Sequence, residues 1–387
     1  MSVTAPPLSW FDPIIDRRGT ASLKWQKYRG RDVIPLWVAD MDFRSPPAVV
    51  EALKVRVNHG IFGYTLPPSE LVETVVEMLA RDYRWRVEPS WLVWLPGLVT
   101  GLNVVCRAVG EDGDGILTMV PIYPPFLSAP ALSRRTLATA AMVQNGARWE
   151  IDFDRLEQAV DGRTRLLLLC SPHNPTGRVF ERSELVALAD FCERHDLVLC
   201  SDEIHSGLVL APGRVHIPTA TLGPETARRT VTLLAPSKTF NLPGLGCAFA
   251  VIPDDGLRRR FRRAMEGIVP HVNALGYTAA HAAYRHAGEW HRALLAYLRA
   301  NSDLVAAAVA EMPGLATAEV EATYLAWIDT RGAELDDPAG FFEMAGVGLS
   351  DGREFGAPGF LRLNFGCPRS LLAEALERMR VALTGHR

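Results

Sequence analysis

Lys238 is the residue whose type and position most favour chemistry in this chain. It is one of four lysines, against 37 arginines, and it alone follows an apolar run, residues 231–236, that predicts a buried strand. An amine at the end of such a strand is partly desolvated, which favours its neutral, nucleophilic form. A neutral amine can form an imine with a carbonyl carbon of a cofactor or substrate. The alternative is a lysine that caps the strand end with its ammonium group in solvent.

Two more polar residues follow predicted buried strands in the same way. Asp202 comes soon after the apolar run 197–200, and Asn174 follows the run 166–170 inside the turn sequence Asn-Pro-Thr-Gly. Ligands bind beyond the carboxyl ends of parallel strands, so we expect these residues and Lys238 to share one sheet edge. Asp202 can keep a pyridine-ring nitrogen protonated or can cap its turn. Asn174 can donate to a ring hydroxyl or can serve only the turn.

Three further features are compatible with a planar, phosphorylated ligand and an anionic substrate. The loop 96–101 contains two glycines and enters an apolar helix pattern, 102–109, so its free backbone N–H groups can hold a phosphate. Tyr123, fixed between prolines, can stack on a ring or pack in the core. Arg362 alternates with apolar neighbours on a predicted strand, where it needs a buried anion: a substrate carboxylate or a structural ion-pair partner.

The elements that position these residues alternate between short apolar strands and helices. The strands are apolar on both faces, and the helix 183–195 has Ser183 as its predicted N-cap. This pattern predicts an α/β fold with a mostly parallel sheet that helices cover on both faces. The predicted strands are residues 116–120, 166–170, 197–200 and 231–234.

Near residue 280 the sequence changes from short apolar runs to long helical patterns. A long helix over 288–311, an extended stretch over 323–328 and a terminal helix over 369–383 predict a smaller α+β domain, joined in space by the N-terminal arm. We therefore expect two domains, as is usual for a chain of 387 residues. The predicted boundaries are 1–47 for the arm and part of the small domain, 48–279 for the large domain and 280–387 for the small domain.

Composition excludes several classes of function. The chain has 48% hydrophobic residues and a net charge of −3, which gives no basic face for nucleic acid or a membrane surface. The arginine-rich run 258–263 is interpreted as the solvated face of a helix. We find no signal peptide, no apolar stretch near the ~20 residues that span a bilayer, and no Gly-x-Gly-x-x-Gly dinucleotide motif.

The cysteines are scattered, without metal-ligand spacing, and no histidine cluster accompanies them. This usage predicts small buried residues of a reducing compartment, no metal site and a cytoplasmic protein. The six cysteines are Cys106, Cys170, Cys192, Cys200, Cys247 and Cys367.

Taken together, these residues resemble the fold-type I pyridoxal-phosphate (PLP) enzymes of the class I/II aminotransferase superfamily. The resemblance is strongest to the MalY/PatB, cystalysin-like branch of cystathionine β-lyases. It covers nearly the whole chain, and the combination of the NPTG, DEIH and SKTFNL sequences is highly specific. The matching segments are LWVADMDF at 36–43, FGYT at 62–65, PHNPTG at 172–177, SDEIH at 201–205, SKTFNL at 237–242 and RLN at 362–364.

The resemblance implies a role in PLP binding for several residues. Lys238 would join the cofactor aldehyde and act as the general acid–base. Asp202 would pair with the ring nitrogen, Asn174 with the ring hydroxyl, and Tyr123 would stack on the ring. The remaining implied cofactor contacts are His205, Ser237 and the backbone N–H groups of Leu98 and Val99.

The substrate contacts implied by the resemblance come from two subunits. Arg362 would bind the substrate carboxylate, and Ala39 would line the substrate site. Tyr64 would reach in from the neighbouring subunit of a homodimer as a further catalytic and substrate-binding residue. Many aminotransferases have a phosphate-binding arginine eight residues after the lysine, where this chain has Gly246. Phosphate binding would then depend on the loop 97–99, Ser237 and Tyr64.

The reaction implied is α,β-elimination, in which a cysteine S-conjugate gives pyruvate, ammonia and a thiol. Many aminotransferases have tyrosine at the position of His205, whereas the lyase branch has histidine, as this chain does. This favours elimination. Transamination uses the same residues and is the first alternative. A pathway-specific lyase or decarboxylase that acts on a larger cysteine conjugate is the second, because fold and cofactor do not fix the outcome. A purely regulatory binding protein is disfavoured by the intact set of polar residues.

Overall fold

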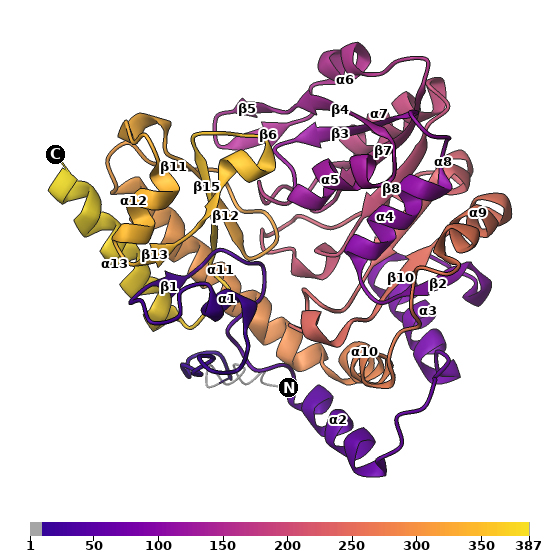
Figure 1. The fold of residues 1–387 in the computed structure, drawn as a ribbon, viewed down its shortest axis with the longest axis horizontal. Helices are drawn as coiled ribbons and strands as arrows, with labels where there is room; N and C mark the ends of the chain where they lie inside the picture. The colour runs from indigo at the N-terminus through magenta and orange to yellow at the C-terminus, as the bar shows by residue number, and fades with distance from the viewer. Residues whose placement is uncertain (1–9, 387) are drawn as a thin grey trace.

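A seven-stranded sheet forms the centre of the larger part of the molecule (Figure 1). The computed structural model describes residues 10–386. Only β10 runs antiparallel to its neighbours, so the predicted mostly parallel sheet is confirmed. In spatial order the strands are β2 (Leu92–Leu95), β10 (Ala248–Val251), β9 (Thr230–Leu234), β8 (Val198–Asp202), β7 (Thr164–Cys170), β3 (Gly115–Val120) and β4 (Thr136–Ala141).

Both faces of this sheet are buried, as the leucines of β7 show. Successive leucines point to opposite sides of the sheet, and each side is covered by a hydrophobic cluster. Leu166 and Leu168 belong to one hydrophobic cluster, and Leu167 and Leu169 to another. The first cluster includes residues of α4 (Leu98–Ala108), α5 (Pro124–Leu132) and α9 (Asp255–Met265). The second includes residues of α6 (Phe153–Ala159) and α7 (Arg182–Arg194), and α7 also contacts α8 (Pro224–Arg229).

The start of α7 differs from the prediction. Its N-cap is Glu181 rather than Ser183, and a capping box joins the side chains of Glu181 and Glu184 to each other's backbone N–H groups. The predicted Ser183 cap is wrong because the reciprocal pair satisfies two free N–H groups, whereas a serine cap satisfies one. The arginine run also differs: Arg258 of α9 is buried, and its guanidinium donates to the carbonyls of Ile252 and Pro253.

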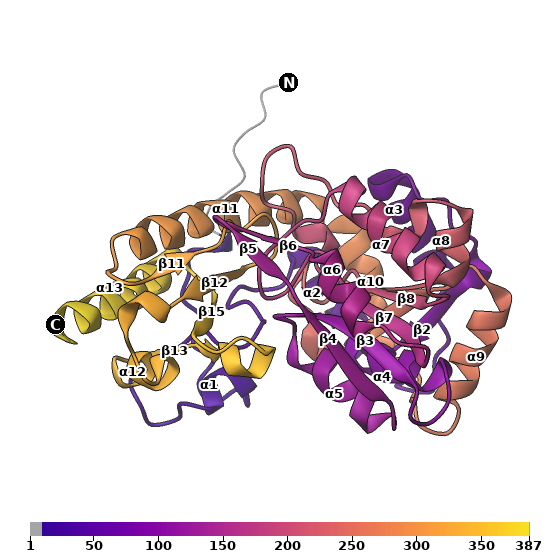
Figure 2. The same ribbon diagram turned by 90° about the horizontal axis from the view of Figure 1, so that it is seen from above.

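A second, smaller layer holds a four-stranded sheet beside the large one (Figure 2). Two long helices, α11 (Gly288–Ala310) and α13 (Arg369–His386), pack against each other and contribute to its core. The predicted helices over 288–311 and 369–383 match them closely, and the predicted stretch 323–328 overlaps β12. In spatial order the strands are β11 (Ala316–Thr317), β12 (Leu325–Asp329), β15 (Phe360–Asn364) and β14 (Ser350–Asp351).

The N-terminal arm joins this smaller layer through a short parallel pair. Strand β1 (Ile34–Pro35) pairs with β13 (Val347–Gly348), as expected for an arm that contributes to the small domain. The large sheet lies within the predicted range 48–279 and the four-stranded sheet within 280–387. The domain boundaries themselves stay a prediction.

The other elements surround these two layers. Helix α1 (Leu23–Gln26) lies in the arm, and α2 (Pro47–His59) and α3 (Ser69–Tyr83) both contact α10 (Ala274–His286). The remaining ones are α12 (Pro338–Met344), the β5–β6 hairpin (Val143–Asn145 and Arg148–Glu150) and 3₁₀ helices at Pro89–Trp91, Ser206–Leu208, Thr219–Thr221, Pro243–Leu245, Arg331–Ala333 and Gly352–Phe355.

Helix α11 meets the length and composition criteria for a membrane span, which the apolar runs of the sequence do not predict. Its buried face, which includes Trp290, Leu294 and Leu298, packs into the core of the smaller layer. Of the apolar 18-residue window, 44% is buried inside the protein. Burial of this kind is also found in the core helix of a globular domain.

Candidate active site

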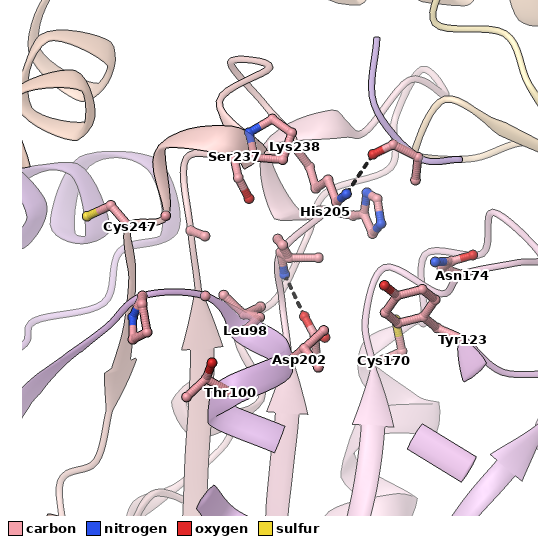
Figure 3. Close-up of a pocket in the computed structure, with 18 residues that line it drawn as sticks. Leu98, Thr100, Tyr123, Cys170, Asn174, Asp202, His205, Ser237, Lys238 and Cys247 are labelled. Atoms are coloured by element: carbon pink, nitrogen blue, oxygen red, sulfur yellow. Dashed lines mark hydrogen bonds between the residues drawn. The ribbon is translucent and has the colours of Figure 1, made fainter. Parts of the chain in front are cut away.

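A cavity of about 220 Å³ opens beyond the carboxyl ends of β7, β8 and β9 (Figure 3). This is the edge at which the sequence placed its polar residues, because each of them ends or follows one of these strands. Among the predicted site residues that line the cavity are Ala39, Leu98, Val99, Tyr123, Asn174, Asp202, His205, Ser237 and Lys238.

Lys238 extends its amine into this cavity from the turn after β9. Its Nζ donates a hydrogen bond of 2.6 Å to the carbonyl of Ala39, on the opposite wall. Burial, together with the charge of Arg362, lowers the pKa of Lys238 to about 8, against the opposing effect of Asp40 and Asp202. At neutral pH a usable fraction of this amine is therefore unprotonated, and the predicted desolvation of the lysine is confirmed.

Asp202 lies at the floor of the cavity at the last residue of β8. Burial raises the pKa of its carboxyl to about 7, although an N–H of Ile204, donating to Oδ1 at 3.1 Å, opposes the rise. A buried carboxyl that stands near its titration point needs a cationic or proton-donating partner to ionise fully. A protonated ring nitrogen supplies both the charge and the proton.

Asn174, which lines the cavity, forms one buried unit with Arg362 behind it. Nη1 of Arg362 donates to Oδ1 of Asn174 at 3.0 Å, and Nη2 donates to the carbonyl of Trp37 at 2.8 Å. Within residues 10–386, no carboxylate lies within ion-pair distance of Arg362, so the alternative of a structural ion pair is not found. Burial lowers the pKa of Arg362 to about 10. The guanidinium is thus a desolvated cation without an anion, a state that favours capture of a carboxylate.

Two buried nitrogen atoms in this region have no hydrogen-bond partner among the described residues. They are Nε of Arg362 and Nδ1 of His205. Burial lowers the pKa of His205 well below its usual value, and the nearby Lys238 and Arg362 charges add to this effect, so its ring is neutral. Unpaired buried nitrogens are costly in a folded protein and indicate a place for ligand atoms.

The N-terminus of α4 forms the phosphate side of the cavity. Gly97 is the N-cap, and the N–H groups of Leu98 and Val99 begin the helix, where an anion is favoured by free donors and by the helix dipole. Ser237 faces the same end of the cavity. Gly246 also lines it, with φ of 58°, and a Cβ there would lie 3.0 Å from the carbonyl of Pro96. A side chain at this position would be strained, so the arginine that many aminotransferases have here would not fit this backbone.

Comparison with known proteins places this arrangement in a family. The model of the aminotransferase class I and II family matches residues 31–379. Cystathionine beta-lyase PatB of Bacillus subtilis (strain 168) is 36% identical over 97% of this chain and 100% of its own length. The chain belongs to the aminotransferase class I and II family.

Two solved structures match nearly the whole of this aminotransferase-family chain. One, named OvoB, has 50% sequence identity and a TM-score of 0.95, and the match covers 97% of this chain and 99% of that one. The other is cystalysin from Treponema denticola, which contains a pyridoxal 5'-phosphate cofactor. It has 33% identity and a TM-score of 0.93 over 97% and 99% of the two chains. The predicted superfamily, its PatB and cystalysin branch and the fold-type I class are confirmed.

Two predicted site residues do not line this cavity: Arg362, which contacts it through Asn174, and Tyr64, which lies apart from it. Tyr64 is fully exposed in the connection between α2 and α3, where Ile61, Phe62 and Leu66 are also exposed. With residues 270–275 this connection lines a separate hollow on the surface. A tyrosine so placed cannot serve the site of its own subunit, so the structure leaves the predicted role across a dimer open.

Lys24 is a charged residue that sequence reasoning did not single out. It lies among polar neighbours in the sequence, but its side chain is fully buried and its Nζ lies 2.7 Å from Oδ2 of Asp42. A signal was present, because Asp40 and Asp42 alternate with apolar residues in a segment that has to be buried. Two carboxylates in such a segment require cations from elsewhere in the chain.

Proposed function

We propose that the protein is a PLP-dependent carbon–sulfur β-lyase that cleaves cysteine S-conjugates to pyruvate, ammonia and a thiol. The observation that carries the proposal is the convergence of the Lys238 amine and the Asp202 carboxyl in one buried cavity beneath the start of α4. The names of its relatives, which include a cystathionine beta-lyase, favour elimination over the other reactions of this fold.

The residues of the cavity fit PLP from one end to the other. Asp202 would hold the ring nitrogen, the N–H groups of Leu98 and Val99 would hold the phosphate, and Tyr123 would cover a ring face. The amide nitrogen of Asn174 is left for the ring hydroxyl, since its Oδ1 accepts from Arg362. When bound, the cofactor supplies an electron sink for the bonds of the substrate α-carbon.

Lys238 and Arg362 divide the remaining chemistry between them. Arg362 holds the substrate carboxylate, which orients the Cα–H bond for cleavage. The Lys238 amine, with a pKa of about 8, takes the Cα proton, and it can return a proton later in the cycle. Loss of the sulfur substituent from the β-carbon as a thiolate then completes the elimination, and water converts the three-carbon product to pyruvate and ammonia.

The deciding experiment is pyruvate release from L-cystathionine by the purified PLP-loaded protein without a keto acid. We expect sustained multiple turnovers with one ammonia for each pyruvate. Turnover that begins only after a keto acid is added would make the protein an aminotransferase and would overturn the lyase proposal. If L-cystathionine is inert, bulkier cysteine conjugates are tested in the same assay, and thiol release without a keto acid supports a pathway-specific lyase.

Replacing Arg362 with alanine is expected to raise KM for the amino-acid substrate by about 10²- to 10³-fold, because a buried charge-assisted pair is worth roughly 3–4 kcal/mol. Binding of PLP, followed by absorbance, should change little. The matched control is Arg331→Ala, which removes an exposed arginine paired with Asp329 beside the same small sheet. An unchanged KM in Arg362→Ala would assign Arg362 to structure.

We also propose that two copies of the chain form the enzyme and share their sites through Tyr64. Exposed apolar residues surround Tyr64, and a large apolar surface of this kind requires a cover. A second copy is the simplest one, since a two-fold axis places the same segment against both sites. The scattered free cysteines, all buried, support a reducing, cytoplasmic location as a further proposal.

Mixing two inactive variants tests the shared site. Tyr64→Phe and Lys238→Ala subunits, exchanged in equal amounts, should regain about one quarter of the wild-type activity, because half of the dimers then contain one intact site. The measurement is pyruvate release before and after exchange, with subunit exchange verified by differently tagged chains. Complete exchange without recovery would contradict the role of Tyr64 across the dimer.

A further inference from the structure

A cluster of four charged residues ties the N-terminal arm to the segment 37–43. The guanidinium of Arg17 holds both carboxylate oxygens of Asp40, at 3.0 and 2.9 Å, and it also reaches Oδ1 of Asp42 at 2.7 Å. Lys24 pairs with Asp42 and donates to the backbone carbonyl of Asp40 at 3.2 Å. Both aspartates therefore receive their counter-ions from the arm.

The segment 37–43 is also one wall of the active-site cavity. Asn364 donates to the carbonyls of Val38 and Asp40, each at 2.6 Å, and fixes the segment from the side of β15. Between those two carbonyls lies the carbonyl of Ala39, which accepts hydrogen bonds from Lys238 Nζ at 2.6 Å and from Tyr324 OH at 2.9 Å. The orientation of the reacting amine thus depends on where this segment lies.

Asp40 differs from the other charged groups that act on the Lys238 amine. Its carboxylate is neutralised by Arg17, which lies outside the cavity and belongs to the arm. Loss of that ion pair would leave this carboxylate, on the residue next to the carbonyl that holds the amine, with only a longer contact of 3.9 Å to Lys24. The titratable groups near Lys238 are Asp40 from the segment 37–43, Asp202 from β8, His205 from the turn after it, Arg362 from β15, Tyr123 at the cavity wall and Tyr324, whose hydroxyl shares the Ala39 carbonyl with the amine.

We propose that Arg17 and Asp40 are positioning residues for Lys238: their ion pair holds the Ala39 carbonyl against the amine and sets how readily the amine loses its proton. The arm then acts on the chemistry without touching substrate or cofactor. This proposal rests on Lys238 being the lysine that joins PLP, and the experiment below separates the two claims.

The test measures how cofactor-free protein takes up PLP as pH is varied. Only the unprotonated amine adds to the aldehyde carbon, where a C=N bond forms and the aldehyde oxygen leaves as water. The rate of the absorbance change against pH therefore has a midpoint that reports the proton affinity of the amine. The variants are Arg17→Gln and Asp40→Asn. Arg31→Gln is the matched control, because Arg31 is an arm residue that pairs with Glu343 instead.

The two variants should move the midpoint in opposite directions. Arg17→Gln leaves Asp40 with only its longer contact to Lys24, at 3.9 Å, so more of the negative charge acts on the amine. This favours the ammonium form and raises the midpoint by up to about one pH unit, the scale of one charge acting over several ångströms. Asp40→Asn removes the negative charge, leaves the positive charge of Arg17 and lowers the midpoint by a similar amount. Arg31→Gln should leave the midpoint unchanged.

The sign of the shift separates an electrostatic role from loosened structure. Midpoints that stay at the wild-type value, or that move in the same direction in both variants, would overturn the proposal. If Arg17→Gln fails to fold, Asp40→Asn decides alone, since its carboxamide keeps the shape of the side chain, and only a lower midpoint supports the proposal. Lys238→Ala protein that still gives the absorbance change would refute the assignment of Lys238 itself.

Discussion

Replacing Lys238 with alanine is expected to lower kcat for pyruvate release by about 10⁴-fold or more, because the variant loses both the covalent link to PLP and the general acid–base. The absorbance band of the lysine-bound cofactor should vanish as well. The physical reason is the position of this amine, which donates to the Ala39 carbonyl and has a pKa lowered to about 8, so that a usable fraction is unprotonated at neutral pH. Steady-state kinetics and an absorbance spectrum measure the two effects on one sample.

Lys54→Ala is the matched control, because Lys54 is an exposed lysine paired with Glu51 on α2. It should keep the full rate and the full band. A Lys238→Ala enzyme that retained the band and turned over at more than about one hundredth of the wild-type rate would contradict the central assignment, since loss of a general acid–base alone costs at least that much.

The sequence predicted the location of the site because the rules that place it are local. Apolar runs such as 166–170 and 231–234 indicate buried strands, and each is soon followed by a polar residue. The parallel order of β7, β8 and β9 then brings Asn174, Asp202 and Lys238 to one edge. Local rules sufficed there because the geometry of a parallel sheet fixes which strand ends meet.

Contacts between distant segments were beyond this reasoning. The burial of Lys24 depends on its partner Asp42 and on the fold of the arm, which no local pattern encodes. Arg362 was recognised as a residue in need of a partner, but its contacts with Asn174 and Trp37 come from three separate segments. The N-cap of α7 was missed for a smaller reason: serine and glutamate both cap helices, and the reciprocal bond with Glu184 decided between them.

Two electrostatic shifts in the cavity act together. Burial raises the pKa of Asp202 to about 7 and lowers that of Lys238 to about 8, so the acid and the base approach each other in proton affinity. In this buried environment each group alone favours its uncharged form. A ring that carries a proton on its nitrogen and a phosphate at its other end would restore charge to Asp202 and leave the amine free to react. Cofactor binding is thus favoured by the same burial that makes the charged forms of both groups costly.

Asp202→Asn is therefore expected to change activity and stability in opposite directions. The variant loses the carboxylate that keeps the ring nitrogen protonated, and kcat should fall by about 10³-fold, since an uncompensated buried charge costs roughly 3–5 kcal/mol. The cofactor-free protein should gain stability. In wild type the folded carboxyl holds its proton up to a pH of about 7, whereas the carboxyl of the unfolded chain releases it near the ordinary aspartate pKa of 3.8.

The sign of this linkage follows from the protons bound in each state. Between the two pKa values the folded protein binds more protons than the unfolded chain, so wild-type stability falls as pH rises through that window and levels off above it. Asparagine does not titrate, and the variant should be more stable at pH 8 by on the order of 2–4 kcal/mol, with little difference below pH 4. Denaturant unfolding at several pH values measures this.

Asp196→Asn provides the control for the same chemical change, because Asp196 is a fully exposed residue just before β8. It should alter neither kcat nor the pH dependence of stability. A variant at position 202 that lost stability at pH 8 together with activity would show that the carboxylate supports the fold rather than the cofactor. If Asp202→Asn gains stability and loses turnover, Asp202 is a buried functional carboxyl. A carboxyl selected for stability would not have a pKa near neutral pH.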